Sequence, residues 1–177
     1  MGLKIIEIFA ILFNLSYTLL YLNESNWAWP CAILGALAYF VLCKKNNLIG
    51  ESWLQILYLG AAIFGWWAPL NNFQSPIHSW TIQIGLFVGS LFAWLIAKKL
   101  LQKRQTSYPW LDSFALIFGI TGTLLQVAYS PVNWYYFLLV NLVSMYTYWN
   151  KGMKLSMLLY VVYFFLSLQG IYYSISS

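Results

Sequence analysis

The stretch TIQIGLFVGSLFAWLIAKKLLQKR, residues 81–104, combines the two features that decide the fold. It begins as a continuous apolar run and ends with four basic residues, Lys98, Lys99, Lys103 and Arg104. A run of about 20 apolar residues is long enough for a helix to cross the hydrocarbon core of a bilayer. Only helices and closed barrels satisfy the backbone in lipid, and a run without alternation favours a helix. The stretch therefore predicts a transmembrane helix with a basic end.

Six further apolar runs of similar length precede and follow this one. The chain has 177 residues, of which 62% are apolar and 7% charged, whereas soluble domains carry about 25% charged residues. Because so few polar side chains cannot cover a water-soluble globule, we expect an all-α integral membrane protein with one transmembrane domain over residues 1–177. The seven predicted spans are residues 3–22, 28–43, 51–69, 80–97, 111–129, 133–149 and 153–174.

The basic residues orient the predicted spans. When the spans are threaded in order, all nine Lys and Arg residues of the chain fall on the side that holds the N-terminus. Lys and Arg collect in cytoplasmic loops, so we predict a cytoplasmic N-terminus and a C-terminus outside. Anionic lipid headgroups account for the net charge of +5, and nucleic acid is not expected as a partner. The remaining basic residues are Lys4, Lys44, Lys45, Lys151 and Lys154.

The chain also contains a weak internal repeat. An offset of 107 residues relates Asn26-Trp27, before the second span, to Asn133-Trp134, before the sixth. The same offset pairs Tyr39 with Tyr146. The loop after the sixth span is two residues shorter, so beyond it an offset of 105 takes over. This second offset pairs Tyr58 with Tyr163, Ala62 with Ser167, and Gly65 with Gly170.

One span separates spans one to three from spans five to seven, so both triplets cross the bilayer in the same direction. We therefore predict a parallel repeat of three plus one plus three helices, related by an axis along the membrane normal. Repeat one covers about 1–70, the linker helix about 80–97 and repeat two about 110–177. Transporters built from such repeats bind their substrate between the repeats, near the bilayer midplane.

Polar and aromatic side chains at this depth are candidate ligands, because polar groups are costly in lipid. Asn14 and Asn141 lie centrally in their spans, and helical spacing places Trp134 on the face of Asn141. We expect rings, amides and hydroxyls to hold a planar ring attached to a polyol. Helix packing and interfacial anchoring are the competing explanations. Similar stripes run along spans three and seven, as Gln55, Tyr58, Ala62 and Gly65, and as Tyr160, Tyr163, Ser167 and Gly170.

The acidic residues indicate that catalysis and ion coupling are not the function. Glu7, Glu24, Glu51 and Asp112 lie in loops or within about two turns of a span end, so we expect no carboxylate at the centre. The single histidine, His78, falls in an outer loop without metal-binding partners. No catalytic constellation or metal-ligand cluster is evident. We expect a protein that is not an enzyme, without cofactor or metal, and passive facilitation of transport.

The order and spacing of these motifs resemble the PnuC family of bacterial vitamin transporters over nearly the whole chain. The third span carries Leu54-Gln55, Tyr58 and the run Phe64-Gly65-Trp66-Trp67, similar to the family's Leu-Gln, aromatic, and aromatic-Gly-Trp-aromatic signature. Asp112 opens the fifth span, where the family has an aspartate. The remaining motif residues are Asn133, Trp134, Phe137 and Asn141 of the sixth span, and Leu155, Tyr160 and Tyr163 of the seventh.

The resemblance implies a three-one-three fold like that of the SWEET sugar transporters, in the bacterial plasma membrane. It also implies facilitated diffusion of nicotinamide riboside, which a separate cytosolic kinase would trap by phosphorylation. Assembly with further copies of the chain stays open. The residues expected at the substrate site are Gln55, Tyr58, Asn141, Trp134, Tyr160, Tyr163, Asn14 and Trp66.

Four positions depart from the family's pattern. Phe137 stands where the family has a second tryptophan, and the tryptophan that usually closes the span-three motif is replaced near Pro69. Thr123 stands where nicotinamide riboside carriers tend to have an amide, and Val132 where a glutamate is expected. These changes would reshape the pocket, so thiamine, riboflavin or a deoxynucleoside stays open as the cargo. The alternative class is a seven-span receptor or assembly subunit that transports nothing. A receptor would be expected to expose a larger soluble loop or tail, whereas the longest hydrophilic stretch here covers only about residues 98–109.

Overall fold

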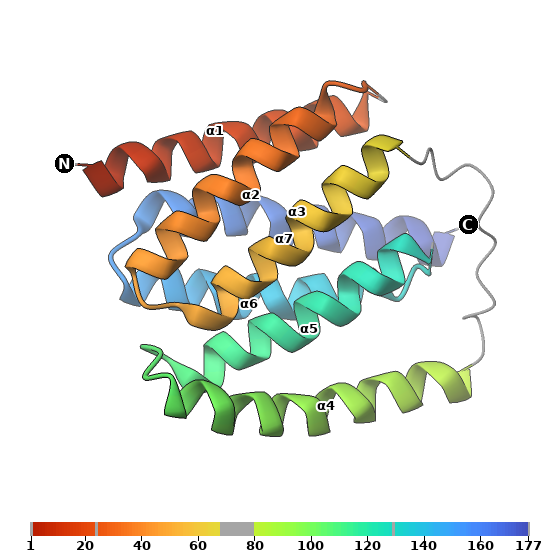
Figure 1. Cartoon of the computed structure of the whole chain (residues 1–177). Helices are drawn as coiled ribbons and strands as arrows, with labels where there is room; N and C mark the ends of the chain where they lie inside the picture. The colour runs from red at the N-terminus through yellow and green to blue at the C-terminus, as the bar shows by residue number, and fades with distance from the viewer. Residues whose placement is uncertain (1, 24, 68–79, 129, 177) are drawn as a thin grey trace.

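Seven α-helices follow one another in a computed structural model that describes residues 2–23, 25–67, 80–128 and 130–176 (Figure 1). Each predicted span corresponds to one helix, which confirms the all-helical fold. The second and fourth helices run on to Lys45 and Lys103, because long basic side chains at a span end can reach the headgroup region. The helices are α1 (Gly2–Leu22), α2 (Ala28–Lys45), α3 (Ile49–Trp67), α4 (Trp80–Lys103), α5 (Pro109–Val127), α6 (Asn133–Asn150) and α7 (Lys154–Ser176).

Hydropathy divides the seven helices into two kinds. Four contain segments long and apolar enough to span a membrane by composition alone: Gly2–Tyr21, Ala28–Lys45, Thr81–Lys103 and Lys154–Ile175. The other three, α3, α5 and α6, are 18 or 19 residues long. They carry Glu51, Asp112 and Asn141, all of which are buried inside the bundle. Their lower hydropathy therefore reflects polar side chains that face other helices and not lipid.

Six of the helices pack side by side in a closed ring. Around it, α1 contacts α2, α2 contacts α3, α3 contacts α5, α5 contacts α6, α6 contacts α7, and α7 returns to α1. Helix α4 stands outside the ring, against α5. The two ends of the chain lie at opposite ends of the bundle (Figure 1). Each triplet thus supplies half of the ring, and the two seams between triplets are α3–α5 and α1–α7.

The α2–α3, α4–α5 and α6–α7 connections lie at the same end of the bundle as the N-terminus (Figure 1). All nine Lys and Arg residues belong to this end, because each lies in one of these connections, in the adjoining helix ends or in the first turn of α1. We call it the basic end.

A constant offset of 105 residues relates the two triplets. Helix α2 spans residues 28–45 and α6 spans 133–150, while α3 and α7 begin at residues 49 and 154. The turns that precede α3 and α7 contain the positive-φ residues Asn47 (58°) and Gly152 (70°), again 105 apart. The offset of 107 proposed for the second and sixth spans was therefore wrong. The match of the two Asn-Trp pairs was a coincidence, since Asn133 already belongs to α6 whereas Asn26 precedes α2.

Two apolar clusters form the core. One lies toward the basic end and joins both triplets through residues of α1, α2, α6 and α7, among them Ala10, Leu42, Tyr148 and Leu159. The other packs α4 against α5 and α6 around Phe118, whose ring stacks on Phe114 with centroids 4.0 Å apart. The first cluster thus closes the interior of the ring toward the basic end.

Candidate functional site

A buried carboxylate lies between the triplets near the basic end. Glu51, in the first turn of α3, is 1% exposed. Its Oε1 accepts a hydrogen bond from the Ser144 hydroxyl at 2.8 Å, and its Oε2 accepts one from the Tyr148 hydroxyl at 3.3 Å. Both partners belong to α6. The side chain of Glu51 therefore joins the third helix of one triplet to the second helix of the other.

Tyr148 extends this connection to two more helices. Its hydroxyl lies 3.3 Å from the Cys43 sulfur on α2. Its ring stacks on Tyr160 of α7, with centroids 5.1 Å apart and planes at 23°, and meets the edge of Tyr39 on α2 at 6.3 Å. All of these side chains are buried. We refer to Glu51, Ser144, Tyr148, Cys43, Tyr39 and Tyr160 together as the gate cluster.

Two further carboxylates cap helices of the opposite triplet. Asp112 of α5 accepts hydrogen bonds from the backbone N–H groups of Gly50 at 2.7 Å and Glu51 at 2.8 Å, at the start of α3. Glu7 of α1 accepts bonds from the backbone N–H and the hydroxyl of Ser156, both at 2.9 Å, at the start of α7. A carboxylate at a helix N-terminus satisfies free N–H groups and interacts favourably with the helix dipole. The two caps are equivalent under the offset of 105.

The sequence indicated where these carboxylates lie along their spans but not that they are buried. Glu7, Glu51 and Asp112 do lie near span ends, as expected, but all three are buried within the bundle. The signal for Glu51 was present, because Gln55 and Tyr58 follow it by four and seven residues and share its helix face. Glu24 and His78 fall outside the described residues.

At mid-depth the ring interior is lined by an amide, a hydroxyl and tyrosines. Asn141, 5% exposed, donates from Nδ2 to the Ser167 hydroxyl at 3.0 Å, and Ser167 in turn donates to the Tyr163 carbonyl at 2.9 Å. The Tyr163 ring meets Tyr160 edge to face at 6.0 Å. Gln55, one turn from Glu51 along α3, is 4% exposed. The structure thus brings the predicted stripes of α6 and α7 together.

Tyr58 connects the third helix to this set. It is half-buried, and its hydroxyl interacts with the Thr123 side chain of α5. On the other side of the ring the Tyr163 hydroxyl of α7 lies against Thr18 and the Asn14 carbonyl of α1. We refer to Asn141, Ser167, Gln55, Tyr58 and Tyr163 as the mid-depth set.

The structure places the side chain of Asn14 between α1 and α2. Its Nδ2 donates to the Ala10 carbonyl of its own helix at 2.8 Å, and its side chain lies against Gly35 of α2. Only its backbone carbonyl reaches toward α7, where the Tyr163 hydroxyl donates to it at 3.3 Å. Glycine at residue 35 leaves room for the amide, since a Cβ there would lie 2.5 Å from Nδ2. The side chain of Asn14 thus packs α1 on α2.

The tryptophans separate into packed and exposed residues. Trp134 of α6 lies against Gly170 of α7, and Trp29 of α2 lies against Gly65 of α3, so the two contacts are 105 residues apart. An added Cβ at either glycine would overlap the indole ring. Trp66, in contrast, is 52% exposed on the outer surface of α3. The structure does not bring Trp66 together with the mid-depth set, whose members are buried or half-buried.

The arrangement offers hydrogen-bonding and stacking groups suited to a molecule with a flat ring and several hydroxyl groups. Amide and hydroxyl groups donate and accept hydrogen bonds in several directions, while tyrosine faces supply stacking surface. The gate cluster lies on the basic-end side of these groups and spans the interior through α2, α3, α6 and α7.

Comparisons with known proteins give a consistent result. A family model described as nicotinamide mononucleotide transporter matches residues 4–174. The riboflavin/roseoflavin transporter RibM of Streptomyces davaonensis is 25% identical over 84% of this chain and 74% of its own length. The nicotinamide riboside transporter PnuC of Escherichia coli is 23% identical over 78% of this chain and 71% of its own length.

A solved structure has the same fold. The crystal structure of the vitamin B3 transporter PnuC superimposes with a TM-score of 0.75 and covers 94% of this chain and 78% of that protein, at 14% identity. At this identity the match concerns the arrangement of helices.

Proposed function

The chain belongs to the nicotinamide mononucleotide transporter family, and from this premise we propose that it facilitates the uptake of nicotinamide riboside across the plasma membrane of a bacterium. It is a membrane transporter. Its relatives are named for nicotinamide riboside and for riboflavin, and these names suggest the candidate cargoes. The observation that carries the proposal is the mid-depth set, an uncharged group of amide, hydroxyl and phenol side chains inside the ring. Nicotinamide riboside combines a flat ring with a ribose, and this set offers partners for both.

In this proposal Gln55 and Asn141 hydrogen-bond the ribose and the carboxamide, because they are the amides of the set. Tyr58, Tyr163 and Tyr160 stack on or enclose the ring. Trp134, held against Gly170, walls the site on the side away from the basic end. Asn14 acts through its backbone carbonyl, which positions the Tyr163 hydroxyl. We do not place Trp66 at the site.

We further propose the parallel three-one-three arrangement, with α1–α3 and α5–α7 as the repeats and α4 as the linker. The offset of 105, the equivalent caps and the equivalent tryptophan–glycine contacts support it. The basic end would face the cytoplasm, because Lys and Arg collect on that side. The N-terminus would then be inside and the C-terminus outside.

Transport would follow from rocking of the two triplets about an occupied site. The gate cluster would close the cytoplasmic side, since its hydrogen bonds from Ser144 and Tyr148 to Glu51 connect different triplets. Opening toward the cytoplasm would break these two bonds. Closing the opposite side would bring α2 and α6 together around Trp29 and Trp134. Passive movement down the gradient, with a cytosolic kinase trapping the product, completes the proposed cycle.

Riboflavin is the second candidate cargo. The RibM relative is named for riboflavin and has the higher identity of the two relatives, 25% against 23%. Riboflavin also combines a flat ring with a polyol, so the same set of side chains would suit it. The smaller Phe137 and Thr123 in place of tryptophan and an amide would make room for its larger ring.

The test is uptake of labelled cargo into proteoliposomes that contain the purified protein. Nicotinamide riboside, riboflavin, thiamine and a deoxynucleoside are compared in separate assays. We expect Asn141→Ala to reduce uptake of the preferred cargo about tenfold, the value of one lost hydrogen bond of about 1.4 kcal/mol. Asn150→Ala is the matched control, because Asn150 lies exposed at the basic end of the same helix.

If the Asn141→Ala protein is folded and takes up every cargo at the wild-type rate, Asn141 is not part of the substrate site. A wild-type protein that transports none of the four, although it is folded in the vesicles, would refute the proposed cargo class. Melting temperatures in detergent establish folding in each case, and a cargo-dependent rise measures binding separately from transport.

A further inference from the structure

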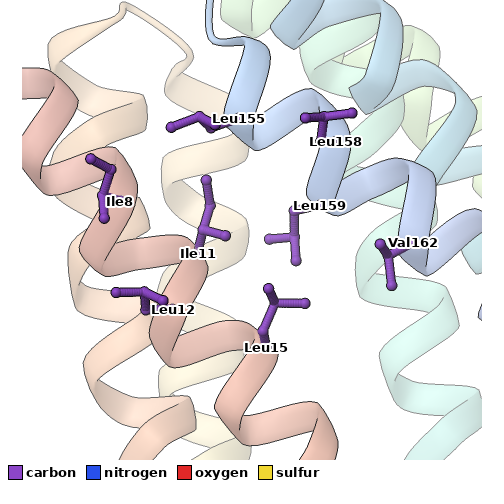
Figure 2. Close-up of a pocket in the computed structure, with 8 residues that line it drawn as sticks. All are labelled: Ile8, Ile11, Leu12, Leu15, Leu155, Leu158, Leu159 and Val162. Carbon is purple, nitrogen blue, oxygen red and sulfur yellow. The ribbon is translucent and has the colours of Figure 1, made fainter.

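A groove lined only by aliphatic side chains runs between α1 and α7, on the outside of the ring. Its volume is about 350 Å³. Figure 2 shows its lining residues, which project from the two helices toward the gap between them. From α1 they are Ile8, Ile11, Leu12 and Leu15, and from α7 Leu155, Leu158, Leu159 and Val162.

The groove exists because the two seams between triplets are packed differently. At the α3–α5 seam, Gly119 receives Leu54, and Gly50 lies directly on the backbone of Asp112. A Cβ at Gly119 would lie 2.7 Å from Leu54, and one at Gly50 would lie 2.5 Å from the Asp112 carbonyl oxygen. These two glycines therefore let α3 and α5 approach closely.

The offset of 105 replaces both glycines at the α1–α7 seam. Asn14 is equivalent to Gly119, and Leu155 is equivalent to Gly50. Leu155, which lines the groove, is larger than glycine and keeps α1 from approaching α7 as α5 approaches α3, whereas the Asn14 side chain is turned toward Gly35 of α2. The recess that results is open to the membrane, because Leu12 and Leu158 on its rim are 56% and 54% exposed.

The basic end of the groove carries two lysines. Lys4 lies one turn before Ile8 on the same face of α1, and Lys154 lies one turn before Leu158 on the same face of α7. Both lysines are exposed, and the Lys154 ammonium lies 5.9 Å from the Trp149 ring. Lysines at this depth attract anionic headgroups.

Glu7 is the acidic group nearest to these lysines along the chain. Its carboxylate is turned into the bundle, 7% exposed, and accepts the two hydrogen bonds from Ser156. It therefore compensates the start of α7 internally and does not occupy the lysine face.

We propose that this groove is a specific binding site for an anionic phospholipid of the leaflet at the basic end. One acyl chain lies in the recess between α1 and α7, and the phosphate group is held by Lys4 and Lys154. All the lining side chains are aliphatic, which suits a segment of an acyl chain about 10 Å long, and the two positive charges suit a phosphate at one end. This inference does not depend on the cargo.

The test compares phosphatidylglycerol with phosphatidylcholine of identical acyl chains, each added to delipidated protein in detergent. Native mass spectrometry counts the bound lipids, and melting temperature reports stabilisation, since a ligand that binds only the folded state raises it. We expect phosphatidylglycerol to be retained and to raise the melting temperature by about 5 °C more than phosphatidylcholine.

Two variant pairs locate the site. Lys4→Gln with Lys154→Gln should abolish the difference between the lipids, whereas the control Lys99→Gln with Lys103→Gln at the same end should keep it. Leu12→Trp fills the groove and should lower lipid retention at least fivefold. Leu19→Trp, on the same helix but outside the groove and 63% exposed, should not.

Equal stabilisation by both lipids would overturn the proposal, as would an unchanged lipid preference in the Lys4 and Lys154 double variant. Retention that survives Leu12→Trp would mean that the lysines bind a headgroup without an acyl site, which also contradicts it. A change in oligomeric mass on Leu12→Trp, with lipid retention unaltered, would assign the groove to a second copy of the chain.

Discussion

Replacing Glu51 with leucine tests whether the gate cluster depends on its carboxylate. Leucine has a similar volume but accepts no hydrogen bond, so the hydroxyls of Ser144 and Tyr148 lose their acceptor. Two interhelical hydrogen bonds in a membrane protein contribute about 1 kcal/mol together. Two buried donors left without an acceptor would cost about 2–6 kcal/mol. Cys43 remains 3.3 Å from the Tyr148 hydroxyl and offers a weak substitute, so we expect the lower part of this range.

A loss of about 3 kcal/mol corresponds to a melting temperature about 8 °C lower for a chain of this size. The assay is thermal unfolding of the purified protein in detergent, with Gln102→Leu as the control. Gln102 is exposed on α4, so the same kind of change there should alter stability by less than about 0.5 kcal/mol.

The triple variant Glu51→Leu, Ser144→Ala, Tyr148→Phe removes the donors together with the acceptor. Because replacement of both partners by apolar groups is nearly neutral, it should recover most of the lost stability. The reasoning is refuted if Glu51→Leu melts at the wild-type temperature, or if the triple variant melts below the single one.

Three further results are expected from thermal unfolding of single variants. Gly170→Ala should lower the free energy of unfolding by about 1–3 kcal/mol, because the added Cβ would overlap the indole of Trp134. The control Gly60→Ala, where a Cβ meets nothing within 4 Å, should raise the free energy of unfolding by about 0.5 kcal/mol. Equal effects of the two substitutions would contradict the packing described. Asp112→Ala and Glu7→Ala should each cost about 0.5–2 kcal/mol as lost caps, and a neutral result at either position would show that water replaces the carboxylate. Gly152→Ala should cost about 1 kcal/mol because of its φ of 70°, and no loss would mean that the turn relaxes.

The sequence predicted the helices and their order because apolar length and charge sidedness are local properties. It did not predict the register of the repeat, since abundant aromatic residues create chance matches such as that of Tyr39 with Tyr146. At the offset of 105 that the structure shows, the position equivalent to Tyr39 in the second triplet is Ser144. Register depends on which residues occupy equivalent positions in space, and the contacts of Gly65 and Gly170 reveal it.

The candidate site was predicted in part. Helical spacing correctly placed Asn141, Tyr163 and Ser167 on facing surfaces, because an amphipathic face is set by the 3.6-residue period. The placement of the Asn14 side chain against Gly35 could not be predicted, since it depends on a neighbouring helix. The gate cluster was missed because a carboxylate near a span end is ordinarily solvated, and only the tertiary fold buries Glu51. That the gate cluster closes the substrate path on the cytoplasmic side stays a prediction.

The reciprocal caps have a consequence for how such a chain could have originated. Each triplet begins its last helix with hydrogen bonds to a carboxylate of its counterpart, so neither half can complete itself alone. A single ancestral three-helix protein would have met this requirement by pairing with an identical copy, each copy supplying one carboxylate to the other. In the proposed parallel arrangement, fusing two such genes would require one additional membrane crossing to keep both copies in the same orientation, and α4, outside the ring, would provide it.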